Sequence, residues 1–214
     1  MGVRNISFLL TGYRKPMTGS GNRAASILHW KKLAVLTGRG SDAAGANVFA
    51  FARYCPTSEE KDTNIEPLRY RQLLADCDRK FKEYEAAGCQ TYFNKKDHLW
   101  TLYEYETGTF QIPETVEEGM IYGGCNCGNC HLTIVPNGDV YACRRVQNSK
   151  VGNVFSDRLA DVWVCQMEGY RDYSRFRKCA KCELLAFCRG CPTVASGKDG
   201  DFYAADPQCW KEVG

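Results

Sequence analysis

The strongest constraint on this chain is a run of four cysteines within thirteen residues, spaced CxxC-x5-CxxC, at Cys179, Cys182, Cys188 and Cys191. Cysteines this dense form disulfides or bind metal, because core cysteines do not gather in CxxC pairs by accident. The spacing suits metal binding, since two thiolates about one turn apart can converge on one centre. Further cysteines lie on both sides of this run, at Cys125, Cys127, Cys130, Cys143 and Cys209.

The cysteine count and the N-terminus together favour metal over disulfides. The chain has 13 cysteines in 214 residues. Its start contains one early basic residue, Arg4, and no small-residue cleavage site, so we do not interpret it as a signal peptide. Disulfides are rare in the reducing cytosol. We therefore expect a cytoplasmic metal-binding protein rather than a disulfide framework.

The composition argues against two classes of partner. Apolar residues make up 44% of the chain and charged residues 25%, both ordinary for a globular protein. The net charge of +3 is too small to indicate nucleic-acid binding. No apolar run approaches the roughly 18 residues that a membrane helix needs. We expect neither a nucleic-acid nor a membrane partner.

Residues 1–46 carry no motif that indicates a function. Glycines interrupt this segment, and none of them has the spacing of a P-loop. The only plausible helix is Ser26–Leu36, which has a partial apolar stripe. We assign residues 1–46 no definite fold and expect partial disorder there.

The next segment has the pattern of a β/α unit. Asn47–Tyr54 is apolar through most of its length and predicts a strand covered on both faces. Pro67 suits the first turn of a helix whose apolar face continues to about Ala87. Thr91–Phe93 is a candidate for the following strand. His98–Glu106 has aromatic residues at near-alternate positions and fits either a strand or a helix.

Several cysteines and a histidine stand apart from the metal spacings. Cys77 lies on the apolar stripe of the predicted helix, so we interpret it as core. Cys55 and Cys89 are isolated and receive the same interpretation. No second histidine stands at ligand spacing from His98, which indicates a structural, hydrogen-bonded role. Cys165 lies off the metal spacings and is left out of the site.

The pattern of the sequence changes from Gly119. An Asn-Gly pair at residues 137–138 lies between two β-branched runs and predicts a hairpin. That hairpin would carry Cys143 back beside Cys130. Ser156 can cap a short amphipathic helix. Residues 119–214 therefore predict a small cysteine-rich domain.

The cysteines in this domain suffice for two four-thiolate sites. Iron–sulfur clusters and structural zinc sites each take four thiolates. A [4Fe–4S] cube is wide and can collect ligands from distant loops, whereas zinc usually draws on two close CxxC pairs. Here CxxC-x5-C continues to cysteines much farther away, which favours clusters. The alternative is a zinc-stabilised binding module without redox chemistry. Nine cysteines are candidate ligands, one more than two sites need: Cys125, Cys127, Cys130, Cys143, Cys179, Cys182, Cys188, Cys191 and Cys209.

These motifs resemble the SPASM domain of radical SAM enzymes over about 85 residues, from Cys125 to Trp210. The resemblance rests on a cysteine before a hairpin, a Gly-x4-Cys motif, a CxxC-x5-C motif, and then a nearby and a distant cysteine. The segments Val-Gly-Asn-Val and Asp-Pro-Gln-Cys match as well. One departure is that two residues separate Cys188 from Cys191, where family members commonly have three.

The resemblance implies two auxiliary [4Fe–4S] clusters with interleaved ligands. It implies that Cys179, Cys182, Cys188 and Cys209 hold the second cluster. Cys127 competes with Cys125 for the first. In the resembled enzymes these clusters relay electrons or engage a peptide substrate, and the enzymes often modify ribosomally made peptides. The implied ligands of the first cluster are Cys125, Cys130, Cys143 and Cys191.

Residues 47–88 also resemble the late β/α part of the radical SAM barrel, around Phe51-Ala-Arg-Tyr-Cys-Pro. The CxxxCxxC motif that binds the SAM-cleaving cluster does not occur in the sequence. We expect the C-terminal part of a radical SAM/SPASM protein, truncated or detached. The predicted fold is α/β, with a partial (β/α) barrel over residues 47–118 and a SPASM-like domain with a β-hairpin and short helices over residues 119–214.

That interpretation sets the expected activity and partners. We name no catalytic residue and leave open whether the chain is an enzyme. SAM would bind only in a complete parent enzyme. The expected partners are a peptide substrate or a second chain that carries the radical SAM core.

Overall fold

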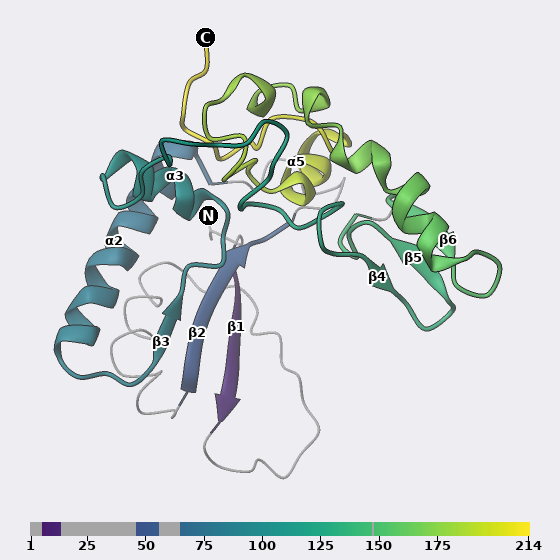
Figure 1. Ribbon diagram of the computed structural model, residues 1–214. Helices are drawn as coiled ribbons and strands as arrows, with labels where there is room; N and C mark the ends of the chain where they lie inside the picture. Colours follow the sequence, from purple (N-terminus) through teal and green to yellow (C-terminus); the bar gives the residue numbers. More distant parts are fainter. Residues whose placement is uncertain (1–5, 14–45, 56–64, 147) are drawn as a thin grey trace.

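The structure is a computed structural model that describes residues 6–13, 46–55, 65–146 and 148–214. A layer of strands and two helices lies beside a region of short strands, short helices and loops that contains most of the cysteines (Figure 1). The predicted helix Ser26–Leu36 lies outside the described residues. So does most of the segment for which partial disorder is expected.

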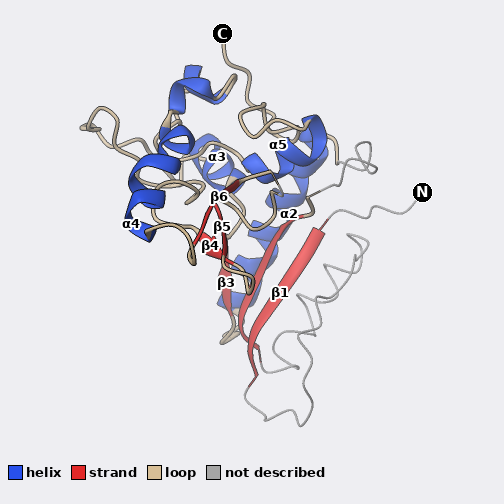
Figure 2. Cartoon of the chain, turned by 90° about the vertical axis from the view of Figure 1, so that its right-hand side faces the viewer, coloured by secondary structure: helices blue, strands red, loops and turns tan. Residues whose placement is uncertain are grey.

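The first sheet has the strand order β1-β2-β3. Strand β1 (Ile6–Tyr13) pairs antiparallel with β2 (Ala46–Arg53), and β3 (Tyr92–Asn94) pairs parallel with β2. The strands predicted near β2 and β3 are confirmed. The sequence reasoning missed β1, which lies side by side with β2 in Figure 2. The described strands thus form a small mixed sheet, and they do not show a partial barrel.

Helix α2 (Pro67–Ala86) covers this sheet and confirms the predicted amphipathic helix. Its buried face packs with the strands, and the rings of Phe81 and Phe93 stack with 4.5 Å between centroids. Cys77 is buried in this cluster, so its predicted core role is confirmed. Apolar periodicity therefore identified this core correctly.

The segment His98–Glu106, whose sequence fits either a strand or a helix, forms helix α3 (Leu99–Glu106). The side chain of Asp97 accepts a hydrogen bond from the Leu99 N–H at 3.0 Å, which satisfies a donor that a helix start leaves free. The buried residues Leu99, Trp100 and Leu102 belong to the α2 core. Leu184 and Cys188 join the same cluster. The cysteine-rich loop therefore packs directly on the α/β layer.

The second sheet has the order β4-β5-β6, with both pairs antiparallel. Its strands are β4 (Thr133–Ile134), β5 (Asp139–Tyr141) and β6 (Lys150–Asn153). The predicted Asn-Gly hairpin joins β4 to β5 and is confirmed. Gly138 has φ of +84°, a conformation that glycine adopts without strain.

The rest of the cysteine-rich region consists of short helical segments. The predicted helix after Ser156 is broken into α4 (Leu159–Asp161) and a π-helical turn, η3 (Val162–Gln166). Three 3-10 turns follow, and then helix α5 (Pro192–Asp199). The turns are η4 (Glu168–Arg171), η5 (Tyr173–Arg175) and η6 (Cys179–Lys181).

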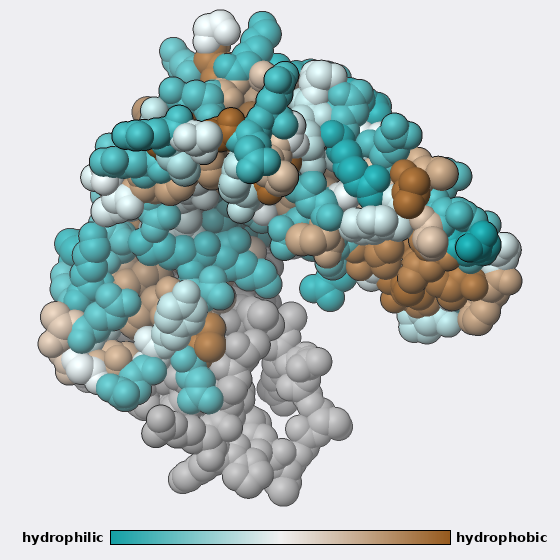
Figure 3. Space-filling view, in the orientation of Figure 1, coloured by the Kyte–Doolittle hydropathy of each residue, from teal (hydrophilic) through white to brown (hydrophobic). Residues whose placement is uncertain are grey.

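An exposed apolar patch lies on this region, away from the α/β layer. Figure 3 shows brown surface gathered over the β4–β6 sheet and the adjoining helical turns. Large apolar side chains exposed there are Ile134, Phe155, Leu159 and Val164. Separately, no helix among the described residues combines the length and the apolar character that crossing a membrane requires.

The packing of α2 predicts a contrast between two of its leucines. Leu74 is fully buried, whereas Leu68 is 72% exposed. Leu74→Ala should lower the free energy of unfolding by about 2–5 kcal/mol, because it leaves a cavity in the core. Leu68→Ala should change it by less than about 0.5 kcal/mol. Urea unfolding followed by circular dichroism measures both, and similar losses would show that α2 does not pack as described.

Candidate metal centres

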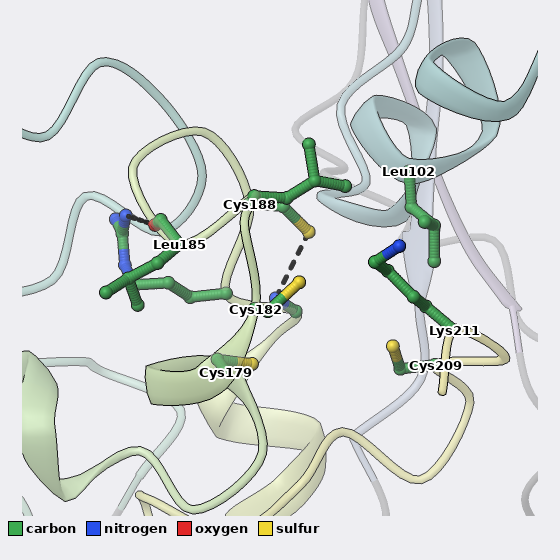
Figure 4. A pocket seen from close by; sticks show the side chains of 10 residues that line it. Leu102, Cys179, Cys182, Leu185, Cys188, Cys209 and Lys211 are labelled. Atoms are coloured by element: carbon green, nitrogen blue, oxygen red, sulfur yellow. Dashed lines mark hydrogen bonds between the residues drawn. The ribbon is translucent and has the colours of Figure 1, made fainter. Parts of the chain in front are cut away.

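Four cysteines line one pocket and form what we call the second thiol group: Cys179, Cys182, Cys188 and Cys209. The pocket encloses roughly 280 Å³, including space open to solvent. Figure 4 shows the four sulfur atoms around the space between the loop of residues 179–191 and the C-terminal segment. Leu102 of α3 and Lys211 also line this pocket.

Local backbone structure explains this convergence. The 3-10 turn η6 separates Cys179 from Cys182 by one turn, and the Cys182 N–H donates to the Cys179 carbonyl at 3.0 Å. Lys178 Nζ donates to the carbonyl of Cys209 at 3.0 Å, which ties the C-terminal segment to the loop. Cysteines far apart in sequence are thus held around one space.

Burial favours the protonated form of two thiols in this group. Burial raises the pKa of Cys179 to about 12 and that of Cys188 to about 12. A bound metal requires thiolates and must therefore displace these protons. The Gly190 N–H donates to Cys188 Sγ at 3.4 Å and would stabilise a thiolate there.

What we call the first thiol group consists of Cys125, Cys127, Cys143 and Cys191, and Cys55 joins it through Cys191. The side chains of Cys125 and Cys127 are hydrogen-bonded to each other. Cys143 and Cys191 lie within electrostatic range of Cys127. A further thiol, that of Cys55 at the end of β2, is hydrogen-bonded to Cys191.

Two basic side chains surround the first thiol group. Arg145 donates to Cys55 Sγ at 3.1 Å and to Cys191 Sγ at 3.5 Å. His98 is hydrogen-bonded to Cys125. The hydrogen bond from Cys55, and then the charge of Arg145, lower the pKa of Cys191 despite its burial. The pKa values of Cys125 and Cys191 are thus lowered, whereas hydrogen bonds to these two sulfur atoms, and then burial, raise the pKa values of Cys127 and Cys55.

The two groups meet at Gly190, between Cys188 and Cys191. Gly190 has φ of +60°, and a side chain there would meet Asp206 Cβ at 2.5 Å. This left-handed residue lets Cys188 join the second group and Cys191 the first. The Asp206 carboxylate accepts a hydrogen bond from the Cys191 N–H, with 2.7 Å between Oδ2 and the nitrogen, and this bond fixes the turn.

A buried ion-pair network connects this turn to the α/β layer. Arg53 of β2 donates to Asp97 Oδ2 at 2.8 Å and to Asp206 Oδ1 at 2.5 Å. It also donates to Gln208 Oε1 at 3.2 Å. Because Asp206 also accepts the Cys191 N–H, one carboxylate couples the end of β2 to the first thiol group.

Eight of the nine predicted cysteines fall into these two groups, and Cys130 does not. Cys130 is exposed, whereas Cys127 is buried and Cys125, Cys143 and Cys191 are buried or partly buried. The sequence reasoning missed Cys55, which was assigned to the core. His98 was assigned a structural, hydrogen-bonded role, and its hydrogen bond goes to Cys125. The signal for Cys55 was its place directly after a predicted strand, where loops carry functional side chains.

Residues 125–192 match the family model for SPASM, an iron-sulfur cluster-binding domain. The chain contains a SPASM domain. The match includes every cysteine of the two groups except Cys55 and Cys209. No curated protein and no solved structure matches the chain.

The donors of the SPASM region fit iron–sulfur clusters. Thiolates are the usual cluster ligands, and each group supplies at least four cysteines. Arg53 Nη2 is buried and has no hydrogen-bond partner among the described residues. Arg53 lies within electrostatic range of Cys55 and Cys191, so this donor is available to the negative charge of a cluster.

A single zinc ion and a cluster require different spacings of their four thiolates. In the part of the chain that the structure describes, no three His, Cys, Asp or Glu side chains converge closely enough to hold a single metal ion. Four thiolates on one zinc would stand roughly 3.8 Å apart, given Zn–S bonds of about 2.3 Å. In a cube each thiolate binds a different iron atom, so the sulfur ligands stand farther apart.

The ion-pair network predicts a large effect of Arg53. Arg53→Met should lower the free energy of unfolding by about 3–5 kcal/mol, because Asp97 and Asp206 would remain buried without a cation. Arg71→Met is the matched control, since Arg71 forms an exposed pair with Glu106 at 2.7 Å. That control should lose at most about 1 kcal/mol. Urea unfolding under anaerobic conditions measures both, and equal losses would contradict the coupling described here.

Proposed function

We propose that this chain holds two [4Fe–4S] clusters, one in each thiol group, and acts as an iron–sulfur electron-transfer module. Iron–sulfur cluster binding follows from the SPASM domain itself. The observation that supports two clusters is the pair of separate groups, with Cys188 and Cys191 divided between them at Gly190. When bound, the clusters would supply one-electron redox chemistry.

The residues around each group have distinct roles in this proposal. The cysteines hold the clusters, and Leu102 and Leu184 keep water from one side of the second group. Arg145 and His98 offset the negative charge of a thiolate-bound cluster at the first group. The burial, charge and hydrogen bonds around such clusters set their reduction potentials.

The wider role is that of the auxiliary part of a radical SAM enzyme that modifies peptides, in the cytoplasm. The support is the resemblance of the cysteine pattern and of residues 47–88. Because the sequence has no CxxxCxxC motif, we propose a partner chain that carries the radical SAM core, or a peptide substrate. The partial barrel over residues 47–118 belongs to this proposal, and its support is the parallel unit β2-α2-β3.

The cluster content is the first test. Protein reconstituted anaerobically should contain about eight irons and eight sulfides per chain, four per cube. Cys182→Ala should lose the second cluster and fall toward about four irons, while Cys165→Ala, outside both groups, should keep the full content. Iron, sulfide and zinc assays decide between clusters and the zinc alternative. Colourless protein with zinc and no sulfide would overturn the proposal.

The second test concerns SAM. Reductive cleavage needs a cluster with three protein thiolates and one open iron, and four cysteines close each cluster here. The reconstituted chain should therefore yield no 5′-deoxyadenosine from SAM and dithionite above the level of a Cys143→Ala, Cys182→Ala double variant. Chromatography of the product measures this. Turnover by the unsubstituted chain would show an open iron and refute four-thiolate ligation.

A further inference from the structure

We propose that Cys55 binds the first cluster and that Cys130 does not. This inference rests on the proposed function of the first thiol group. One ligand of the cluster would then come from the segment directly after strand β2, outside residues 125–192. The other ligands would be Cys143, Cys191 and one of the pair Cys125 and Cys127.

The position of Cys55 carries the proposal. Its thiol is hydrogen-bonded to that of Cys191, which lies across the boundary between the two parts of the fold. A single guanidinium, that of Arg145, donates to both sulfur atoms, at 3.1 Å for Cys55 and 3.5 Å for Cys191. Two thiols that share one cation occupy one site. Cys55 therefore lies beside Cys191, a proposed cluster ligand, before any metal binds.

The ion pairs of Arg53 and the hydrogen bond of Asp206 to Cys191 hold Cys55 and Cys191 near each other. Arg53, two residues earlier, is fixed by its ion pairs with Asp97 and Asp206. Asp206 also accepts the Cys191 N–H at 2.7 Å. One carboxylate thus positions both cysteines, Cys191 directly and Cys55 through Arg53. Pre-positioned ligands of this kind favour binding of a metal group.

The loop that carries Cys130 is held on the outside instead. The Gly128 carbonyl accepts from Arg171 Nε at 2.7 Å, and the Asn129 side chain accepts from the Tyr173 hydroxyl. Gly128 has φ of +81°, and its Cα faces Tyr170 so closely that a Cβ would meet it at 3.0 Å. The Cys130 N–H also donates to the Asn126 carbonyl at 3.1 Å, so the backbone of this loop is fixed. Cys130 is exposed on this fixed loop.

A cluster ligated by Cys55 would join the two parts of the chain. The loop between Cys55 and Cys143 would be closed by metal as well as by packing. Binding free energy would then stabilise β2 together with the SPASM domain. Without Cys55, the cluster would stabilise the SPASM domain alone.

Alkylation of the unaltered chain tests the inference without any substitution. The chain is treated with N-ethylmaleimide after anaerobic reconstitution with iron and sulfide, and again in urea after removal of the metal with a chelator, because the folded chain raises the pKa of Cys55 through its hydrogen bond to Cys191 and burial. Mass spectrometry then reports each cysteine. Cys55 and Cys143 should be protected only in the loaded protein, and Cys130 should be labelled in both states, like the exposed Cys165. Labelling of Cys55 in loaded protein, or protection of Cys130, would overturn the inference.

Two matched variants provide the second readout. Cys55→Ala should lower the iron content from about eight toward about four per chain and change the electron paramagnetic resonance spectrum of the reduced protein. Cys130→Ala should leave both unchanged. Circular dichroism verifies that each variant is folded. Unchanged iron and spectrum in Cys55→Ala would contradict the inference.

The same experiments separate this inference from the proposed function. An unaltered chain that takes up no iron and sulfide would refute the clusters themselves. A chain with two clusters in which Cys55 stays reactive would refute only the role of Cys55.

Discussion

The buried guanidinium of Arg53 is the interaction on which the rest of the structure depends. It lies 2% exposed between Asp97 and Asp206, which are 5% and 4% exposed. Burial opposes the charge of Arg53, but the two carboxylates more than offset this and raise its pKa. A buried charge persists only with such partners. Through them the end of β2, the start of α3 and the turn before Cys209 are fixed together.

This network explains how cysteines from distant segments meet. Asp206 holds the backbone of Cys191, and Gly190 lets the chain reverse so that Cys188 faces the other group. The two groups therefore share one short loop, and metal in either would tighten the same turn. Metal binding that closes long loops contributes directly to folding. The SPASM region and the α/β layer then stabilise each other through this loop.

The sequence predicted the local parts of this arrangement well. Periodicity identified β2 and α2, and the Asn-Gly pair identified the hairpin, because each is encoded by neighbouring residues. The cysteines of the second thiol group followed from a spacing motif and its resemblance. The position of Cys55 beside Cys191 was missed because it is a long-range contact, which no spacing encodes. Strand β1 was missed for a related reason, since its pairing with β2 spans a long segment.

The central claim is that two separate clusters occupy the two thiol groups. A crystal of the anaerobically reconstituted chain, measured at the iron absorption edge, tests it most directly. We expect two compact peaks of anomalous density, one among Cys179, Cys182, Cys188 and Cys209 and one beside Cys191 and Cys143. A single peak, or density at the zinc edge with none from iron, would contradict this account.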